Sequence, residues 1–194
     1  GQTISPFLLL DYAAPYQFDP TTVQHGVGSH PHRGFETVTI AYQGEVTHKD
    51  SSGGGGTIQA GDVQWMTAGA GILHQEFHSP EFAEKGGLFE MAQLWVNLPA
   101  HAKMTAAGYQ AIVSDQIQTI QLDDAGSQLR VIAGQYQDVD GAATTCSPVN
   151  VWDGTVVEGQ NHSFYVTEGH TTLFVLLSGE VILNDSQTIT APSM

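Results

Sequence analysis

The stretch Gly28-Ser29-His30-Pro31-His32-Arg33-Gly34-Phe35-Glu36 is the most informative part of this 194-residue chain. A second stretch, Ile72-Leu73-His74-Gln75-Glu76, follows further along. Side chains two residues apart in an extended strand point to the same face of a sheet. The two histidines of the first stretch therefore share a face, and so do the histidine and the glutamate of the second. Two such strands facing one another would bring three imidazoles and one carboxylate to a single point.

This grouping predicts a metal site. Its four side chains are His30, His32, His74 and Glu76. Neutral imidazole suits Fe, Ni, Cu and Zn, and a carboxylate offsets part of the charge of a divalent ion. Because no thiolate stands nearby, a closed structural zinc site is disfavoured. A lone His-x-His pair is more often an ordinary pair of histidines, but the second pair repeats its strand geometry, which favours an open catalytic or sensing metal site.

Three segments resemble the signature of the pirin family, which belongs to the cupin superfamily. They are His30–Val38, Gly61–Gly69 continuing into Gly71–Glu76, and Gln93–Pro99. The match is dense over about residues 7–113 and thinner, but continuous, to the end of the chain. The resemblance implies a bicupin, in which one metal, most often iron, is held in the N-terminal barrel by the four residues named above. Zn, Ni, Cu, Mn and Co are the alternative metals.

Pirins are described both as quercetin 2,3-dioxygenases and as regulators that bind transcription factors or metabolic enzymes. The resemblance therefore implies an oxidoreductase that acts on a flavonol-like substrate and O₂, with Glu76 accepting the hydroxyl proton of the flavonol. The alternative is a regulator whose metal reports its redox state to a protein partner without catalysis. The general cupin pattern also places a glutamate just after the His-x-His, so Glu36 is expected near the pocket.

The rest of the chain predicts an all-β fold of two tandem cupin-type double-stranded β-helix barrels. Short apolar segments alternate with turns rich in Gly, Asp and Ser, as in antiparallel barrels. A shift of 135 positions aligns Thr37–Val46 with Thr172–Val181, which predicts strands such as Leu173–Leu177 in a second copy. We expect a metal-binding barrel over residues 1–113 and a second barrel over 114–194 that is incomplete at its C-terminal end. Tyr165, Thr167 and Thr171 replace His30, His32 and Glu36 in that second copy, so we expect it to bind no metal.

Composition limits the partners and the compartment. The net charge is −15 with only five basic residues, which disfavours direct binding to nucleic acid because counterion release needs Lys and Arg. No run of about eighteen apolar residues is present, so no membrane span is predicted. Cys146 is the only cysteine and is expected to be a small apolar side chain. A chain with no disulfide fits a reducing compartment, so we expect a cytoplasmic or, in a eukaryote, a nuclear protein.

Several further features have a structural interpretation. Ser51–Gly56 lacks the Gly-Lys-Ser/Thr ending of a phosphate loop and predicts a flexible hairpin connection. The remaining histidines have no partner at strand spacing and are expected to be exposed or hydrogen-bonded: His25, His48, His78, His101, His162 and His170. The tryptophans lie in apolar strand patterns and are expected in the core: Trp65, Trp95 and Trp152.

Overall fold

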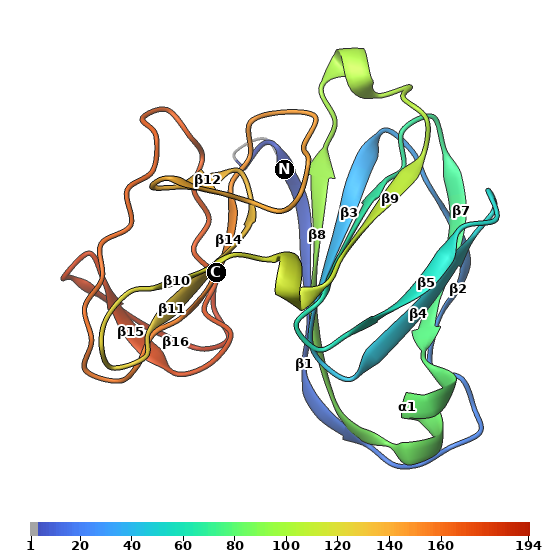
Figure 1. Ribbon diagram of the computed structural model, residues 1–194, viewed down its shortest axis with the longest axis horizontal. Helices are drawn as coiled ribbons and strands as arrows, with labels where there is room; N and C mark the ends of the chain where they lie inside the picture. The colour runs from blue at the N-terminus through green and yellow to red at the C-terminus, as the bar shows by residue number, and fades with distance from the viewer. Residues whose placement is uncertain (1–3) are drawn as a thin grey trace. The chain divides into compact units, whose positions relative to one another are not determined.

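The computed structural model describes residues 4–194, which fold almost entirely as antiparallel β-strands (Figure 1). The strands are β1 (Phe7–Phe18), β2 (Gly26–His32), β3 (Phe35–Gln43), β4 (Glu45–Asp50), β5 (Gly55–Gln59), β6 (Val63–Thr67), β7 (Ile72–His78), β8 (Gly87–Asn97), β9 (Gly108–Ile112), β10 (Thr119–Gln121), β11 (Gln128–Ala133), β12 (Gln135–Tyr136), β13 (Val139–Asp140), β14 (Val151–Thr155), β15 (Glu180–Leu183) and β16 (Gln187–Thr190). One short helix, α1 (Pro80–Lys85), and the 3-10 turns Ala100–Ala102 and Ser114–Gln116 complete the described elements. The predicted all-β, cupin-type fold is confirmed.

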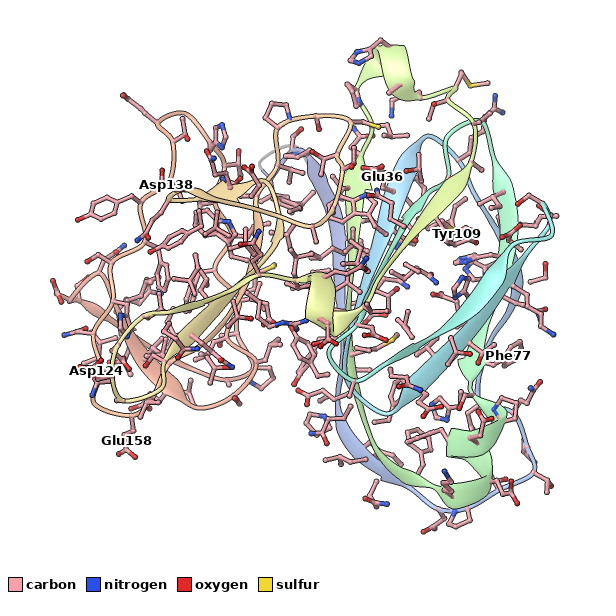
Figure 2. All side chains as sticks on the ribbon, viewed as in Figure 1. Glu36, Phe77, Tyr109, Asp124, Asp138 and Glu158 are labelled. Atoms are coloured by element: carbon pink, nitrogen blue, oxygen red, sulfur yellow. The ribbon has the colours of Figure 1, made fainter. Side chains whose placement is uncertain are left out.

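Two facing sheets form the barrel of the first compact unit, Pro6–His162 (Figure 1). One sheet has the strand order β1-β8-β3-β6-β9 and the other has the order β2-β7-β4-β5. Side chains fill the space between these sheets, among them that of Tyr109 (Figure 2). Polar side chains on the inner faces of these strands therefore lie between the two sheets, inside the barrel.

Strand β3 shows how the sequence divides the two faces of the five-stranded sheet. Val38 and Ile40 are buried and pack with Trp65, which is fully buried, in the largest apolar cluster. The alternate residues Thr37 and Thr39 point to the opposite face, toward the barrel interior. The outward face is therefore apolar and buried, and the inward face carries hydrogen-bonding groups.

Residues 114–162 cover that outward face. Ile132, Ala133, Val149 and Val151, from the β10-β11-β14 sheet and its neighbouring loop, belong to the same apolar cluster as Trp65. This stretch therefore lies in one compact unit with the barrel. The predicted domain boundary between residues 113 and 114 stays a prediction.

The second compact unit, formed chiefly by Ser163–Met194, contains one hairpin. Strands β15 and β16 pair over four residues each, with Val181 opposite Ile189. The prediction of a strand at Leu173–Leu177 was wrong, because a strand needs a continuous hydrogen-bonding partner. Within this segment only Leu176 forms a backbone bridge, to Ser193.

Candidate metal centre

Three histidines meet on the inner face of β2 and β7. These strands are antiparallel neighbours, and His30 lies directly opposite His74 across them. The ring centroids are 4.4 Å apart for His30 and His74, 4.8 Å for His32 and His74, and 4.7 Å for His30 and His32. One nitrogen from each ring lies within 4.8 Å of the others. The expected convergence therefore arises from adjacent strands in one sheet, not from strands that face each other.

The histidine nitrogens fit a metal ion. The side chain of His74 is almost fully buried, and within residues 4–194 neither of its ring nitrogens has a hydrogen-bond partner. His30 Nδ1 lies 2.8 Å from the Gly28 carbonyl oxygen and donates to it, which leaves Nε2 with its lone pair available. Metal-binding histidines commonly donate their second ring N–H to a backbone carbonyl in this way. The buried ring nitrogens of His74 therefore lack a partner, and a bound cation would provide one.

Burial keeps two of these rings in the form that binds metals. Burial, reinforced by the neighbouring His30, lowers the pKa of His32 to about 4. Burial also lowers the pKa of His74 to about 3, with smaller contributions from the other two histidines. Both imidazoles are therefore neutral near pH 7, and neutral imidazole is the metal-binding species.

Glu76 lies at the edge of the histidine cluster. Its Oε2 atom is 3.9 Å from His74 Nε2, and 12% of its side chain is exposed. Burial raises the pKa of Glu76, whereas a hydrogen bond from Gln93 lowers it. A carboxylate beside three imidazoles matches the predicted donor set, while the tight cluster itself consists of the three histidines.

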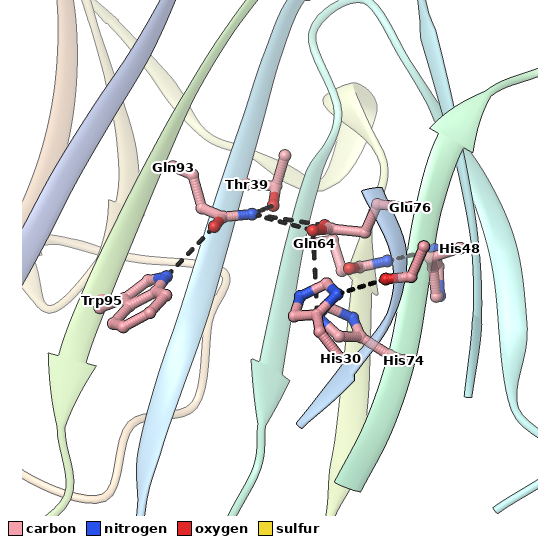
Figure 3. A network of polar contacts seen from close by, with 9 residues as sticks. His30, Thr39, His48, Gln64, His74, Glu76, Gln93 and Trp95 are labelled. Atoms are coloured by element: carbon pink, nitrogen blue, oxygen red, sulfur yellow. Dashed lines mark hydrogen bonds and ion pairs between the residues drawn. The ribbon is translucent and has the colours of Figure 1, made fainter. Parts of the chain in front are cut away.

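A chain of polar contacts lies behind Glu76, and the sequence patterns gave no prediction of it (Figure 3). Trp95 donates from Nε1 to Gln93 Oε1 at 3.1 Å. Gln93 donates from Nε2 to Thr39 Oγ1 at 3.2 Å and to the two oxygens of Glu76 at 3.3 and 3.4 Å. Trp95 was expected in the core, but it is only partly buried and its ring lies 5.2 Å from that of His32. The i, i+2 spacing of Gln93 and Trp95 was the signal that both share an inward face.

Glu36 does not reach the pocket. Its buried carboxylate accepts a hydrogen bond from the Thr67 hydroxyl at 2.7 Å, on the face of β3 opposite Thr37. Gly34, with a φ of +78°, separates β2 from β3 and breaks the alternation that starts at the histidines. Cys146 Sγ lies 4.0 Å from Glu36 Oε1. This cysteine is exposed, but the part of its thiol that is covered, together with the nearby Glu36 carboxylate, raises the pKa of the thiol.

Two other histidines are buried but separate from the cluster of three. His48 accepts a hydrogen bond at Nδ1 from the Gln64 amide, and its ring lies 4.9 Å from that of Tyr109. His78 packs among aromatic rings, 4.6 Å from Phe18 and 4.5 Å from Phe89. Both are therefore satisfied by packing or hydrogen bonding in the barrel.

A surface cavity of about 260 Å³ opens beside the cluster. Its lining residues are Ser29, Lys49, Asp50, Ser51, Leu73, His74 and Gln75. Three of these come from the end of β4 and the following turn, whose conformation Asp50 fixes by accepting bonds from Ser52 and Gly54. The site is thus close to the protein surface on one side.

Comparison with known proteins identifies the family. Residues 1–96 match the family model described as Pirin. The chain is also 73% identical to a crystal structure of a quercetin 2,3-dioxygenase from Acinetobacter baumannii, with a TM-score of 0.97, over 99% of this chain and 67% of that one. The chain belongs to the pirin family.

Two curated relatives extend the comparison. A Pseudomonas aeruginosa protein named "Putative quercetin 2,3-dioxygenase" is 53% identical over 185 residues, which cover 95% of this chain and 65% of that protein. Pirin-1 of Arabidopsis thaliana is 40% identical over 177 residues, 91% of this chain and 57% of its own length. This chain therefore spans less than two thirds of the length of these two relatives.

Proposed function

We propose that this pirin is an iron-dependent dioxygenase that acts on flavonols such as quercetin. The observation that carries the proposal is the buried histidine cluster with Glu76 at its edge, 3.9 Å from His74. The similarity of this chain to a solved quercetin 2,3-dioxygenase supports the choice of substrate class. The donor set supports a transition metal, because it combines imidazole nitrogens with a carboxylate oxygen and has no thiolate.

The metal would be held by His30, His32, His74 and Glu76, as the sequence predicts. A redox-active metal bound by them supplies the electronic coupling between O₂ and an organic anion. His30 would offer Nε2, since its Nδ1 already bonds to the Gly28 carbonyl. An iron ion held by these four protein donors would still have room for O₂ or the substrate.

The chain's own residues would bind and deprotonate the flavonol. Glu76 is the group positioned to accept the hydroxyl proton, and burial raises the pKa of its carboxyl, which makes the carboxylate a stronger base. Phe35 and Trp95 stack with centroids 4.6 Å apart and planes at 28°, and both rings lie 5.2 Å from His32. This aromatic wall offers a flat partner for the rings of a flavonol.

The proposal is tested with the same chain loaded with either iron or zinc. We expect the iron form to consume O₂ and to bleach the absorbance of quercetin, as ring cleavage requires. The zinc form should do neither, because Zn²⁺ has no accessible redox chemistry. If fully iron-loaded protein leaves both O₂ and the flavonol unchanged, the dioxygenase is excluded, and the metal-dependent binding protein predicted as the alternative takes its place.

We infer further that this pirin works in a reducing compartment, the cytoplasm, without contacting nucleic acid directly. The net charge of −15 and the single cysteine support this inference. Among the described residues, no helix is long and apolar enough to cross a membrane. Fractionation of the producing cells tests the location.

A further inference from the structure

Gln93 links Trp95 to Glu76 through hydrogen bonds, and its amide can satisfy both partners in only one orientation. An indole N–H can only donate a hydrogen bond, and an ionised carboxylate can only accept one. Gln93 lies between them, so its amide oxygen must face Trp95 and its NH₂ group must face Glu76. The distances are 3.1 Å to the indole nitrogen and 3.3 and 3.4 Å to the carboxylate oxygens. A flipped amide would bring its oxygen against the carboxylate and its NH₂ against the indole N–H.

Packing holds the indole that sets this direction. Gln93 and Trp95 lie on the inner face of β8, whose partner β3 places Thr39 opposite Gln93. The Trp95 ring is stacked on Phe35 and lies edge-on to His32. The same indole therefore contacts one histidine of the cluster through its ring and Glu76 through the Gln93 amide. Thr39 accepts a further hydrogen bond from the amide at 3.2 Å and so restrains it.

We propose that Gln93, held by Trp95, is a positioning residue that orients the Glu76 carboxylate toward the three histidines. The terminal torsion of a glutamate is broad, so a free carboxylate would sample many orientations. Two contacts from one NH₂ group restrict that rotation, and groups that support a metal-binding side chain commonly change metal affinity by about 10–100-fold. The catalytic consequence rests on the proposed function, whereas the consequence for metal binding does not.

Two substitutions test this role in the whole chain. Gln93→Leu removes the donor to Glu76 at similar volume, and Trp95→Phe keeps an aromatic ring beside Phe35 but removes the N–H that directs the amide. Cobalt(II) is the probe, with its affinity measured by competition with a chelator and its coordination by visible absorption. We expect a loss of affinity of about tenfold or more in both variants, with an altered spectrum.

The chain offers matched controls outside the site. Gln43 Nε2 donates to Glu90 Oε2 at 3.5 Å between β3 and β8, so Gln43→Leu removes a Gln–Glu contact away from the histidines. Trp152 Nε1 is buried without a hydrogen-bond partner among the described residues, so Trp152→Phe removes an indole N–H that orients no neighbouring side chain. Because neither control touches the support of a metal-binding side chain, both should bind cobalt within about threefold of the unsubstituted chain.

The outcomes separate this inference from the proposed function. Unchanged cobalt affinity and spectrum in both Gln93→Leu and Trp95→Phe would overturn the positioning role, as would equal losses in the controls or no cobalt binding by the unsubstituted chain. If Gln93→Leu folds poorly by circular dichroism, Trp95→Phe decides the matter. A chain that shows the expected cobalt losses but never cleaves a flavonol retains the positioning role and loses the dioxygenase. With flavonol turnover present, the variants should lose kcat more than they raise KM.

Discussion

His74 is held in the barrel at an energetic cost that a bound metal ion would offset. The residue is 1% exposed, and among the described residues neither ring nitrogen has a hydrogen-bond partner. An unsatisfied buried polar group costs about 1–3 kcal/mol. A residue kept for stability alone would be apolar here, because Met66 and Ile72 nearby form an apolar cluster. This burial supports the proposed role of His74 as a metal ligand.

Replacing His74 tests that explanation directly. We expect His74→Ala to hold less than about a tenth of the metal bound by the unsubstituted chain, because two histidines and a carboxylate remain. The barrel should stay folded, since the substitution also removes an unsatisfied polar group. Metal content by elemental analysis and melting by circular dichroism are the measurements. His101→Ala, at an exposed histidine, is the control, and a full metal complement in His74→Ala would contradict the assignment.

Glu76 is expected to serve turnover more than metal retention. In Glu76→Gln the amide oxygen can still coordinate weakly, but it cannot accept the proton of the flavonol hydroxyl. We expect kcat to fall by about a hundredfold or more, in line with the loss of a general base, while the metal bound at saturating iron falls by less than half. Steady-state O₂ uptake and elemental analysis on one preparation give both numbers. Equal losses of metal and turnover would show that Glu76 acts only as a ligand.

The residues of the site divide into those that the sequence can reveal and those that it cannot. The His-x-His and His-x-Glu patterns carry their own chemistry, so local spacing is enough to single out His30, His32 and His74. Gln93 has no such chemistry, and its role depends on its distance from Glu76 across the barrel. Such distances between strands that are far apart in sequence are not encoded in local spacing.

At the scale of elements, strands were predictable where alternation and pairing agree. Segments such as Ile72–Phe77 and Gln187–Thr190 alternate and find partner strands, and they form β7 and β16. Leu173–Leu177 is wholly apolar, yet it lacks a continuous partner among the described residues and stays irregular. Glu36 shows the other limit, because one turn at Gly34 reverses which face each later residue occupies. Composition therefore predicts strand propensity, whereas pairing and face depend on turns and neighbours.

The turn before β11 offers a pH-dependent test. Hydrogen bonds from Ser127, above all, lower the pKa of Asp123 to about 2, with further bonds from His162 and the Ala125 backbone. A depressed carboxyl pKa stabilises the fold above the unfolded value near about 4. That stabilisation is lost as the pH falls toward about 2. We expect the melting temperature of Asp123→Asn to lie below that of the unsubstituted chain at about pH 6.

The gap between these two melting temperatures should close as the pH falls from about 4 toward 2, because the unsubstituted Asp123 then also becomes neutral. Asp124→Asn removes the same charge from the exposed neighbouring side chain, and so separates the loss of charge from the loss of the hydrogen bonds. Thermal melts at several pH values provide the measurement. A gap that widens on acidification would show that Asp123 does not stabilise the fold in its ionised form.

At the scale of the whole molecule, charge affects how a flavonol would arrive. A net charge of −15 repels anions, so an already deprotonated flavonol would approach slowly. Under the proposed function, a neutral flavonol would meet no such barrier and would lose its proton to Glu76 after binding. The negative net charge and the proposed role of Glu76 would therefore favour the same order of events. The flavonol would enter in its neutral form and would lose its proton only inside the barrel, so no anion would have to approach the negatively charged protein.

The whole chain is expected to bind one metal ion. Within residues 4–194, His30, His32 and His74 form the one cluster of three or more side chains of metal-binding type. The positions aligned with the first histidine pair and Glu36 in the repeat hold Tyr165, Thr167 and Thr171, which offer neutral oxygens, and Tyr165 is 85% exposed.

Elemental analysis of protein saturated with iron and then desalted should give about one metal per chain, and His74→Ala should bring that value close to zero. The second measurement matters, because a lone surface ion would survive the substitution. A stoichiometry of two, with one ion persisting in His74→Ala, would show that the repeat alignment misplaces the second set of ligands. A single ion lost with His74 would instead tie the chain's metal chemistry to the inner face of β2 and β7.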